Sequence, residues 1–406
     1  MPPNTKKSKG KSAQNNNNNN GRNAKVAHGK NKKQDESDEF ERVLAEITKA
    51  TAAIGMKRAK QMEHEKVRKE REERQKEKNE KSKGIEEEFD MMLRRKQKHQ
   101  HLQQILQQFM TAQRPFLDAP NTEFHSETET RNPNFDVAVG AMQGWRLNME
   151  DEHVVDVVFP DGASDSKEGL FCVFDGHSGK GCATKCRELI PKMARTYATR
   201  TADGTSTVDF EKVYMEADSV LEKGLPDESG CTAVTVHVTP AFITCASVGD
   251  SRAVLCRNGA AFPLAYDHKP ENEQEKARIE AAGGSVSENR VNGQLAMSRA
   301  MGDFTYKAQK SRSPTEQEVI AMPDVIRLQR ESGDAWVVLA CDGIFDVLSN
   351  DELVEHVLSK KHEGKSNKQI CEEICRECLA PPAENGGLFA HAEGTDNMTI
   401  MIVDLK

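Results

Sequence analysis

From about residue 135 to the C-terminus, short apolar segments of strand length follow one another closely, separated by polar and turn-forming residues. Pro240-Ala241 and Asn258-Gly259 supply tight turns between some of them. Strands joined by tight turns are antiparallel, whereas a doubly wound sheet needs a helix after nearly every strand. The expected strands are residues 135–142, 152–159, 170–174, 232–239, 242–248, 252–257, 324–328, 336–341 and 398–405.

Apolar residues at helical spacing, together with helix start and stop signals, occur between these strands. Two helices begin at capping boxes, in which Ser349 faces Glu352 and Ser366 faces Gln369. Further helices are expected over residues 183–200, 210–223 and 271–282. The pattern predicts an α+β fold: two antiparallel β-sheets packed together and flanked by helices, an α-β-β-α sandwich.

The first third of the chain lacks this pattern. Residues 1–34 hold nine lysines or arginines, no acid and a run of asparagines, so we expect a disordered basic tail. Residues 35–110 are rich in Glu, Lys, Arg and Gln and contain no proline, which predicts a long charged helix or a weak coiled coil with apolar ends that could dock on a protein partner. We interpret residues 111–131 as a linker and residues 132–406 as the folded domain.

Composition narrows the class of protein. The 406 residues carry a formal net charge of −8, with 30% charged and 5% aromatic residues. The longest apolar runs have only strand length, no apolar signal region follows the N-terminus, and the first residues lack the glycine needed for myristoylation. We therefore expect a monomeric cytoplasmic protein with no membrane span. The basic tail could simply increase solubility, or it could bind RNA, anionic lipid or a nuclear import receptor.

Ten cysteines are scattered through apolar segments, which is typical of reduced core residues. Cys371, Cys375 and Cys378 have a spacing that can hold an iron–sulfur cluster. However, they follow a helix cap and share a helix face with Ile370 and Ile374, so we interpret them as buried apolar residues.

Three expected strands each have an aspartate at one end, at the boundary between the apolar strand and the polar residues next to it. Asp175 follows residues 170–174, Asp342 follows residues 336–341, and Asp396 precedes the last strand. A single Asp-Gly is usually only a turn. Three of these carboxylates at strand ends instead favour one shared site for a hard divalent cation, which binds several oxygen ligands on a rigid scaffold.

The motifs together resemble the metal-dependent protein phosphatases of type 2C. The resemblance covers residues 132–406 in the family's motif order, with small departures at Ser178 and at Cys231, where many members have serine. The motifs are G-W-R-L-N-M-E-D-E-H (144–153), F-D-G-H-S-G (174–179), S-G-C-T-A-V (229–234), S-V-G-D-S-R-A-V (247–254), D-H-K-P (267–270), R-V-N-G-Q-L-A-M-S-R-A-M-G-D (290–303), A-C-D-G-I-F-D-V (340–347) and G-T-D-N-M-T (394–399).

The resemblance implies hydrolysis of phosphoserine and phosphothreonine by a hydroxide that bridges two Mg²⁺ or Mn²⁺ ions. Asp175 would contact both ions, Asp342 and Asp396 would complete one, and Glu150 with the Gly176 carbonyl would serve the other. The resemblance also places Asp151 behind these ligands, Asp250 and Asp346 at a weaker third ion, Arg146 and Arg290 on the substrate, and His177 as the acid that protonates the leaving oxygen.

Other classes were weighed against this hypothesis. An aspartate-nucleophile phosphatase of the haloacid dehalogenase type needs Asp-x-Asp after a parallel strand, and His177 stands in that place here. A nucleic-acid binder would rest on the basic tail alone. The main alternative is a catalytically silent pseudophosphatase that binds phosphoproteins as a scaffold; such a protein is expected to lack a ligand, and every expected carboxylate is present.

Overall fold

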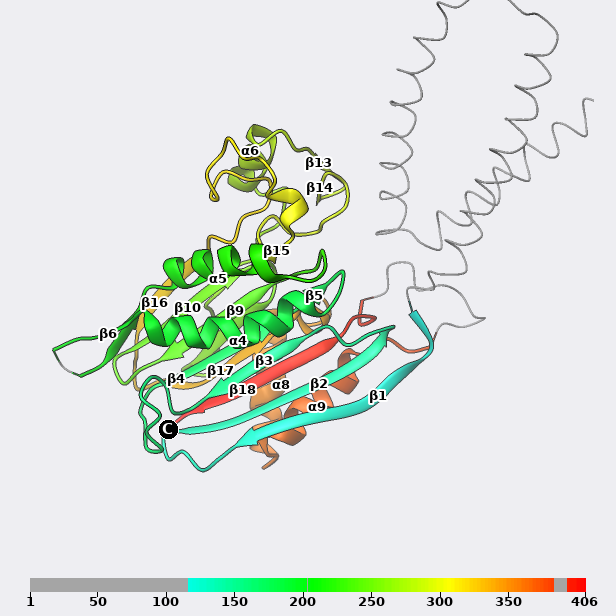
Figure 1. The fold of residues 1–406 in the computed structure, drawn as a ribbon. Coiled ribbons are helices and arrows are strands. Elements are labelled where there is room, and N and C mark those ends of the chain that lie inside the picture. The colour runs from blue at the N-terminus through cyan, green and yellow to red at the C-terminus, as the bar shows by residue number, and fades with distance from the viewer. Residues whose placement is uncertain (1–115, 203, 383–392) are drawn as a thin grey trace, which may run out of the picture. The chain divides into compact units, whose positions relative to one another are not determined.

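Two antiparallel sheets lie at the centre of the part of the chain that the computed structural model describes, residues 116–202, 204–382 and 393–406 (Figure 1). One sheet has the strand order β1-β2-β18-β17-β11-β12 and the other β16-β10-β9-β4-β3. Their bounds are β1 Phe116–Glu129, β2 Phe135–Arg146, β3 Glu152–Asp156, β4 Gly169–Phe174, β9 Ala233–Val238, β10 Phe242–Val248, β11 Arg252–Arg257, β12 Ala260–Pro263, β16 Asp324–Gln329, β17 Asp334–Ala340 and β18 Met398–Leu405.

The two sheets bury apolar side chains on both faces. Val137 and Val139 of β2 point into the layer between the sheets, where they meet residues such as Phe171 of β4. Ala138 and Met142 of β2 face the opposite way and pack with helices on the outer face. Because neither face meets water, the central strands are nearly continuous apolar runs rather than alternating ones.

Helices cover both outer faces, which confirms the predicted sandwich. Helices α4 and α5 pack on the sheet that contains β4, and α7, α8 and α9 pack on the sheet that contains β18. The helix bounds are α4 Gly181–Thr196, α5 Phe210–Gly224, α6 Glu273–Ala281, α7 Asp342–Phe345, α8 Asn350–His362 and α9 Asn367–Cys378. Both predicted capping boxes form, at Ser349 for α8 and at Ser366 for α9. Cys371, Cys375 and Cys378 are buried on the packed face of α9, as expected for core residues.

Short elements complete the description. They are β5 Gly176–His177, β6 Ala198–Arg200, β7 Ser206–Val208, β8 Gly230–Cys231, β13 Val286–Ser287, β14 Arg290–Val291, β15 Met301–Gly302 and the 3₁₀ helix Phe304–Tyr306. The helix predicted to reach residue 200 ends at Thr196, because residues 198–200 pair with β7. No helix of the described ranges is both long enough and apolar enough to cross a membrane.

The predicted linker over residues 111–131 is wrong for most of its length. Residues Phe116–Glu129 form β1, which pairs with β2 from Phe116 opposite Arg146 to Glu129 opposite Val137. An edge strand keeps one side in water, so its polar residues hide the strand pattern. Phe124 anchors β1 above Gly140, whose missing side chain leaves room for the ring: a Cβ there would lie 2.5 Å from Phe124 Cζ. The predictions for residues 1–34 and 35–110 lie outside the described residues.

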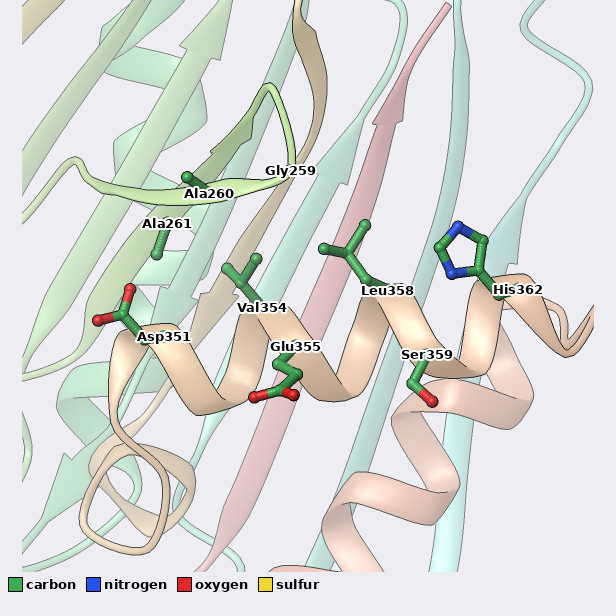
Figure 2. A pocket seen from close by; sticks show the side chains of 9 residues that line it. All are labelled: Gly259, Ala260, Ala261, Asp351, Val354, Glu355, Leu358, Ser359 and His362. Atoms are coloured by element: carbon green, nitrogen blue, oxygen red, sulfur yellow. The ribbon is translucent and has the colours of Figure 1, made fainter.

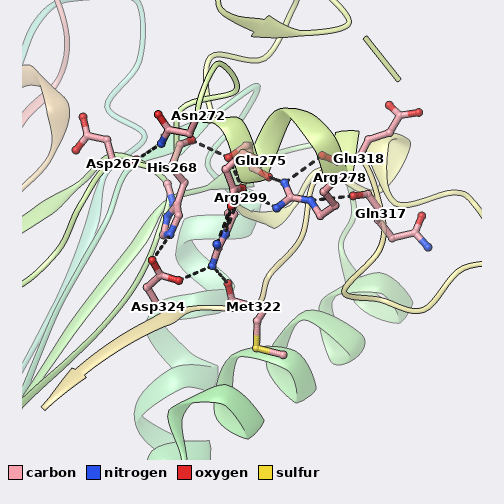
Figure 3. Close-up of polar contacts among 12 residues, drawn as sticks. Asp267, His268, Asn272, Glu275, Arg278, Arg299, Gln317, Glu318, Met322 and Asp324 are labelled. Carbon is pink, nitrogen blue, oxygen red and sulfur yellow. Dashed lines mark hydrogen bonds and ion pairs between the residues drawn. The ribbon is translucent and has the colours of Figure 1, made fainter. Parts of the chain in front are cut away.

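A buried ion-pair network holds helix α6 against the sandwich (Figure 3). Glu275 accepts hydrogen bonds from Arg278 at 2.6 Å and from Arg299 at 2.7 Å. Arg299 in turn donates to Asp324, at the start of β16, at 2.7 Å. These contacts lower the pKa of Glu275 to about 2 in spite of its burial, so the carboxylate is charged and paired at neutral pH.

Candidate metal centre and phosphate site

The three aspartates predicted to share a site meet at one end of the sandwich. Asp342 follows β17 and Asp396 precedes β18, and because these strands pair antiparallel, the two residues come from the same end of the sheet. Asp175 follows β4 of the other sheet, and burial together with the negative charge of Asp342 raises the pKa of its carboxyl group. The structure therefore brings together three aspartates that follow or precede separate strands.

Close backbone approaches fix the remaining predicted ligands beside Asp175. A Cβ on Gly176 would lie 2.4 Å from the Glu150 carbonyl oxygen, so only glycine admits this approach. The Glu150 amide donates to Asn397 Oδ1 at 2.9 Å, and the Glu150 carboxylate accepts from the Gly179 amide at 3.3 Å. Glu150 and Gly176 thus lie together next to the aspartate cluster.

Asp151 lies deeper than the other carboxylates. It is only 4% exposed, and its Oδ2 accepts a hydrogen bond from Thr399 Oγ1 at 2.7 Å. Asp151 and Asp175 each bring a carboxylate oxygen into one cluster with Cys341 Sγ in which all three atoms lie within 4.8 Å of one another. Burial, with the charge of Asp396, raises the pKa of Asp151 to about 7.

The cluster carries more negative charge than its protein neighbours compensate. Burial first, and then the neighbouring carboxylates, raise the pKa values of Asp175 and Asp342 well above their usual range. Oδ1 of Asp151, of Asp250 and of Asp342 is buried without a hydrogen-bond partner among the described residues. Buried oxygens without donors and mutually repelling carboxylates are the donor set that a hard divalent cation satisfies, so these residues fit Mg²⁺ or Mn²⁺.

Asp250 and Asp346, which are predicted to hold a third ion, lie close enough to Asp342 for their charges to raise its pKa further than burial does alone. Asp250 is 2% exposed, whereas Asp346 is exposed and donates its amide to the Asp342 carbonyl oxygen at 2.7 Å. Sequence reasoning missed Lys269, whose Nζ lies 2.5 Å from Asp250 Oδ2. This ammonium group already supplies positive charge to Asp250, which is consistent with weaker metal binding there.

Arg146 is the arginine placed at the carboxylate cluster. It ends β2, donates through Nη2 to Asp396 Oδ2, and keeps 38% of its side chain exposed. Its Nε is buried without a partner among the described residues, so the guanidinium group retains donors for a phosphate oxygen. Arg290 lies on β14, is half-buried and donates to the Gln294 carbonyl oxygen at 2.8 Å.

His177 forms a pair that the sequence did not predict. Its Nε2 lies 2.6 Å from Asp303 Oδ2, and the Asp303 side chain is 5% exposed. Burial lowers the pKa of His177, but the charge of Asp303 and its hydrogen bond more than offset this, so the pKa lies above its usual range. His177 Nδ1 has no partner among the described residues. Asp303 ends the long motif at 290–303, which was the signal available in the sequence.

Figure 2 shows a different hollow, between the β11–β12 turn and α8. It has a volume of about 490 Å³ and is lined by aliphatic side chains such as Val354 and Leu358, with Asp351 and Glu355 among them. None of the predicted catalytic or metal-binding residues lines it. The carboxylate cluster, not this groove, therefore carries the candidate chemistry.

Comparisons with known proteins agree with the resemblance seen in the motifs. Residues 135–387 match the family model described as Protein phosphatase 2C. A probable protein phosphatase 2C of Caenorhabditis elegans is 42% identical over 292 residues, covering 71% of this chain and 79% of that protein. Protein phosphatase 1B of Rattus norvegicus is 40% identical over 305 residues, covering 71% and 74%.

Solved structures support the same fold. A phosphatase from Toxoplasma gondii superposes with a TM-score of 0.57 at 22% identity, covering 70% of this chain and 96% of that one. A serine-threonine phosphatase 2C from the same organism gives 0.55 at 23% identity, covering 70% and 99%. The chain therefore belongs to the protein phosphatase 2C family and is a metal-dependent protein serine/threonine phosphatase.

Proposed function

We propose that this chain hydrolyses phosphoserine and phosphothreonine in proteins with a pair of Mg²⁺ or Mn²⁺ ions. The observation that supports this most directly is the cluster of carboxylates at the strand ends, in which Oδ1 of Asp151, of Asp250 and of Asp342 is buried without a hydrogen-bond donor among the described residues. Such ions would lower the pKa of a bound water molecule and neutralise charge that develops on the phosphoryl group. The same cluster disfavours the scaffold hypothesis, because a binding protein gains nothing from unpaired buried carboxylates.

The residues divide by position. Asp175 lies centrally and would contact both ions. Asp342 and Asp396 would hold one of them. The Glu150 carboxylate and the Gly176 carbonyl oxygen, which lie together, would hold the other. Asp151, which is more deeply buried and accepts a hydrogen bond from Thr399, would orient these ligands. Asp250 and Asp346 would hold a third ion more weakly.

Arginine side chains orient the phosphate. Arg146 would exchange its contact with Asp396 for two phosphate oxygens, which match the planar fork of a guanidinium group. Arg290 would add a second positive charge on the substrate side. Burial lowers the pKa of Arg290, and the negative charge of Asp250 partly offsets this effect. Arg290 therefore lies close enough to the cluster to interact with its charge.

His177 supplies the proton for the leaving group. When the bond between phosphorus and the serine or threonine oxygen breaks, that oxygen takes a proton from the imidazolium ring. Asp303 holds Nε2, so the proton would come from Nδ1, which is buried and has no partner among the described residues until the substrate reaches it. The Asp303 carboxylate also raises the pKa of the ring, which favours the protonated state that an acid must have before each turnover.

A direct test is hydrolysis of a phosphothreonine peptide by the full chain with Mn²⁺, with EDTA, and after replacement of Asp175 by asparagine. We expect turnover with Mn²⁺ only, and none from Asp175→Asn. Asp165→Asn is a matched control, because Asp165 is exposed and lies outside the cluster. Peptide binding without turnover in the presence of Mn²⁺ would instead establish the scaffold hypothesis.

A further inference from the structure

Three cysteine thiols gather behind the catalytic histidine. Cys182 and Cys186 lie one turn apart on α4, and Cys231 lies on β8. Cys231 Sγ is 3.5 Å from Cys182 Sγ and 3.6 Å from Cys186 Sγ, and all three sulfur atoms lie within 4.8 Å of one another. The three residues are 0% exposed, and none of them belongs to the carboxylate cluster.

These separations suit a metal ion held by sulfur. Zinc bonds thiolate sulfur at about 2.3 Å with tetrahedral angles, which places two sulfur ligands about 3.8 Å apart. The observed distances of 3.5 and 3.6 Å are close to this value without any change of backbone. Ordinary core packing needs no such convergence: the seven other cysteines are buried too, yet no other group of three cysteines in the described ranges meets so closely.

The electrostatic environment supports a thiolate at this position. Hydrogen bonds from the Cys182 and Cys231 thiols lower the pKa of Cys186 to about 6, although burial opposes this. The hydrogen bond with Cys186 raises the pKa of Cys182, and burial raises that of Cys231, so one thiolate is favoured among the three residues. Because all three cysteines are fully buried, an ion would enter by local opening, which costs less free energy at the end of a helix than in the core.

We propose that Cys182, Cys186 and Cys231 form a binding site for a soft, thiophilic cation of the Zn²⁺ or Cu⁺ class. Thiolate ligands select such ions, whereas Mg²⁺ and Mn²⁺ prefer the oxygen ligands of the carboxylate cluster. The two sites therefore bind different ions.

The site adjoins the catalytic groups through β8. Cys231 pairs with Gly176 across β5 and β8. The neighbouring Gly230 is packed so tightly that a Cβ on it would lie 2.4 Å from His177 Nε2 and 2.2 Å from Asp303 Oδ2. An ion that binds Cys231 therefore holds the strand against which the acid pair packs.

The test uses Cd²⁺ as a probe on the reduced, EDTA-treated full chain, with excess Mg²⁺ present to occupy the carboxylates. We expect one equivalent of Cd²⁺ to produce the ultraviolet absorption band of a cadmium–thiolate bond. Cys231→Ser should lose this band. Serine is a close isostere, and unfolding by circular dichroism checks that the variant is folded; Cys186→Ala provides a second test of the same site.

Two controls decide the interpretation. Cys375→Ser, in the cysteine-rich helix α9, should keep the full band, and Zn²⁺ or Cu⁺ should displace Cd²⁺ from the wild type. Loss of the band in Cys375→Ser but not in Cys231→Ser would move the ion to α9 and overturn the proposal. So would a thiol count on denatured protein that is two short of ten, because Cys231 would then be paired in a disulfide.

Discussion

Replacing His177 by alanine should slow turnover in proportion to the basicity of the leaving group. A serine or threonine alkoxide needs a proton in the transition state, whereas p-nitrophenolate leaves without one. Positioned proton transfer contributes about 10² to 10⁴ in rate, so we expect a loss of that order on phosphothreonine peptides. The loss on p-nitrophenyl phosphate should be much smaller.

Asp303 extends this prediction to a positioning residue. The buried Asp303 carboxylate lies 2.6 Å from Nε2 of the half-buried His177, and its charge raises the pKa of the imidazole. Hydrogen bonds of charged groups contribute about 1.5–3 kcal/mol, so Asp303→Asn should cost roughly 10- to 100-fold on phosphothreonine. The asparagine removes the charge but keeps the shape, and the loss should again spare p-nitrophenyl phosphate.

The pH profile gives an independent measurement of the same pair. The acid must be protonated, so hydrolysis of phosphothreonine should fall as pH rises through the pKa of His177. Asp303 raises this pKa against the effect of burial. Asp303→Asn should therefore shift the alkaline limb to lower pH.

The assay compares kcat on both substrates for the wild type and the two variants, with Mn²⁺ affinity measured by calorimetry in parallel. Equal losses of His177→Ala on phosphothreonine and on p-nitrophenyl phosphate, together with weaker Mn²⁺ binding, would refute the acid role. His177 would then belong to the metal shell. An unshifted pH limb in Asp303→Asn would refute the role assigned to Asp303.

Three further predictions follow from the fold and the site. Asp175→Asn should abolish Mn²⁺ binding together with turnover, whereas Asp250→Asn should leave the two-ion pair bound; unchanged calorimetric stoichiometry in Asp175→Asn would contradict the assignment. A chain that begins at residue 110 should keep the stability of the domain. A chain that begins at residue 132 lacks β1, and its free energy of unfolding should be lower by about 2 kcal/mol, which is the contribution of burying one phenylalanine. Glu275→Gln should lower the free energy of unfolding at pH 7 by roughly 3 kcal/mol. Because the pKa of Glu275 is lowered to about 2, its contribution to stability is present above the pKa of the unfolded state and is lost as pH falls toward 2. The difference in the free energy of unfolding between wild type and variant, measured by urea titration, should therefore vanish near pH 2.

The central strands could be predicted from the sequence because both of their faces are buried. Apolar runs such as residues 398–403 leave few alternatives, and the aspartates at their ends follow from the same pattern. The capping boxes at Ser349 and Ser366 were equally readable, since each is a local arrangement of four residues. β1 was not, because a half-exposed edge strand rich in Pro, Asn, Thr and Glu looks like a linker.

Side-chain pairs between residues far apart in the sequence could not be predicted either. Asp303 meets His177 over 126 residues, and Lys269 meets Asp250 through a loop whose course no local pattern dictates. The cysteine cluster joins one turn of α4 to a two-residue strand. In each case the sequence supplies the chemical groups, and only the packing of the two sheets decides which of them touch.

The pairing of Phe116 with Arg146 has a consequence for competition at the active site. It attaches the 115 residues that precede β1 to the chain directly opposite the arginine proposed to bind phosphate. A serine or threonine phosphorylated near residue 116 would be a ligand tethered to the domain, not a separate molecule in solution. Short tethers produce effective concentrations in the millimolar range. A phosphate attached close to residue 116 would therefore compete with a phosphoprotein in solution for Arg146.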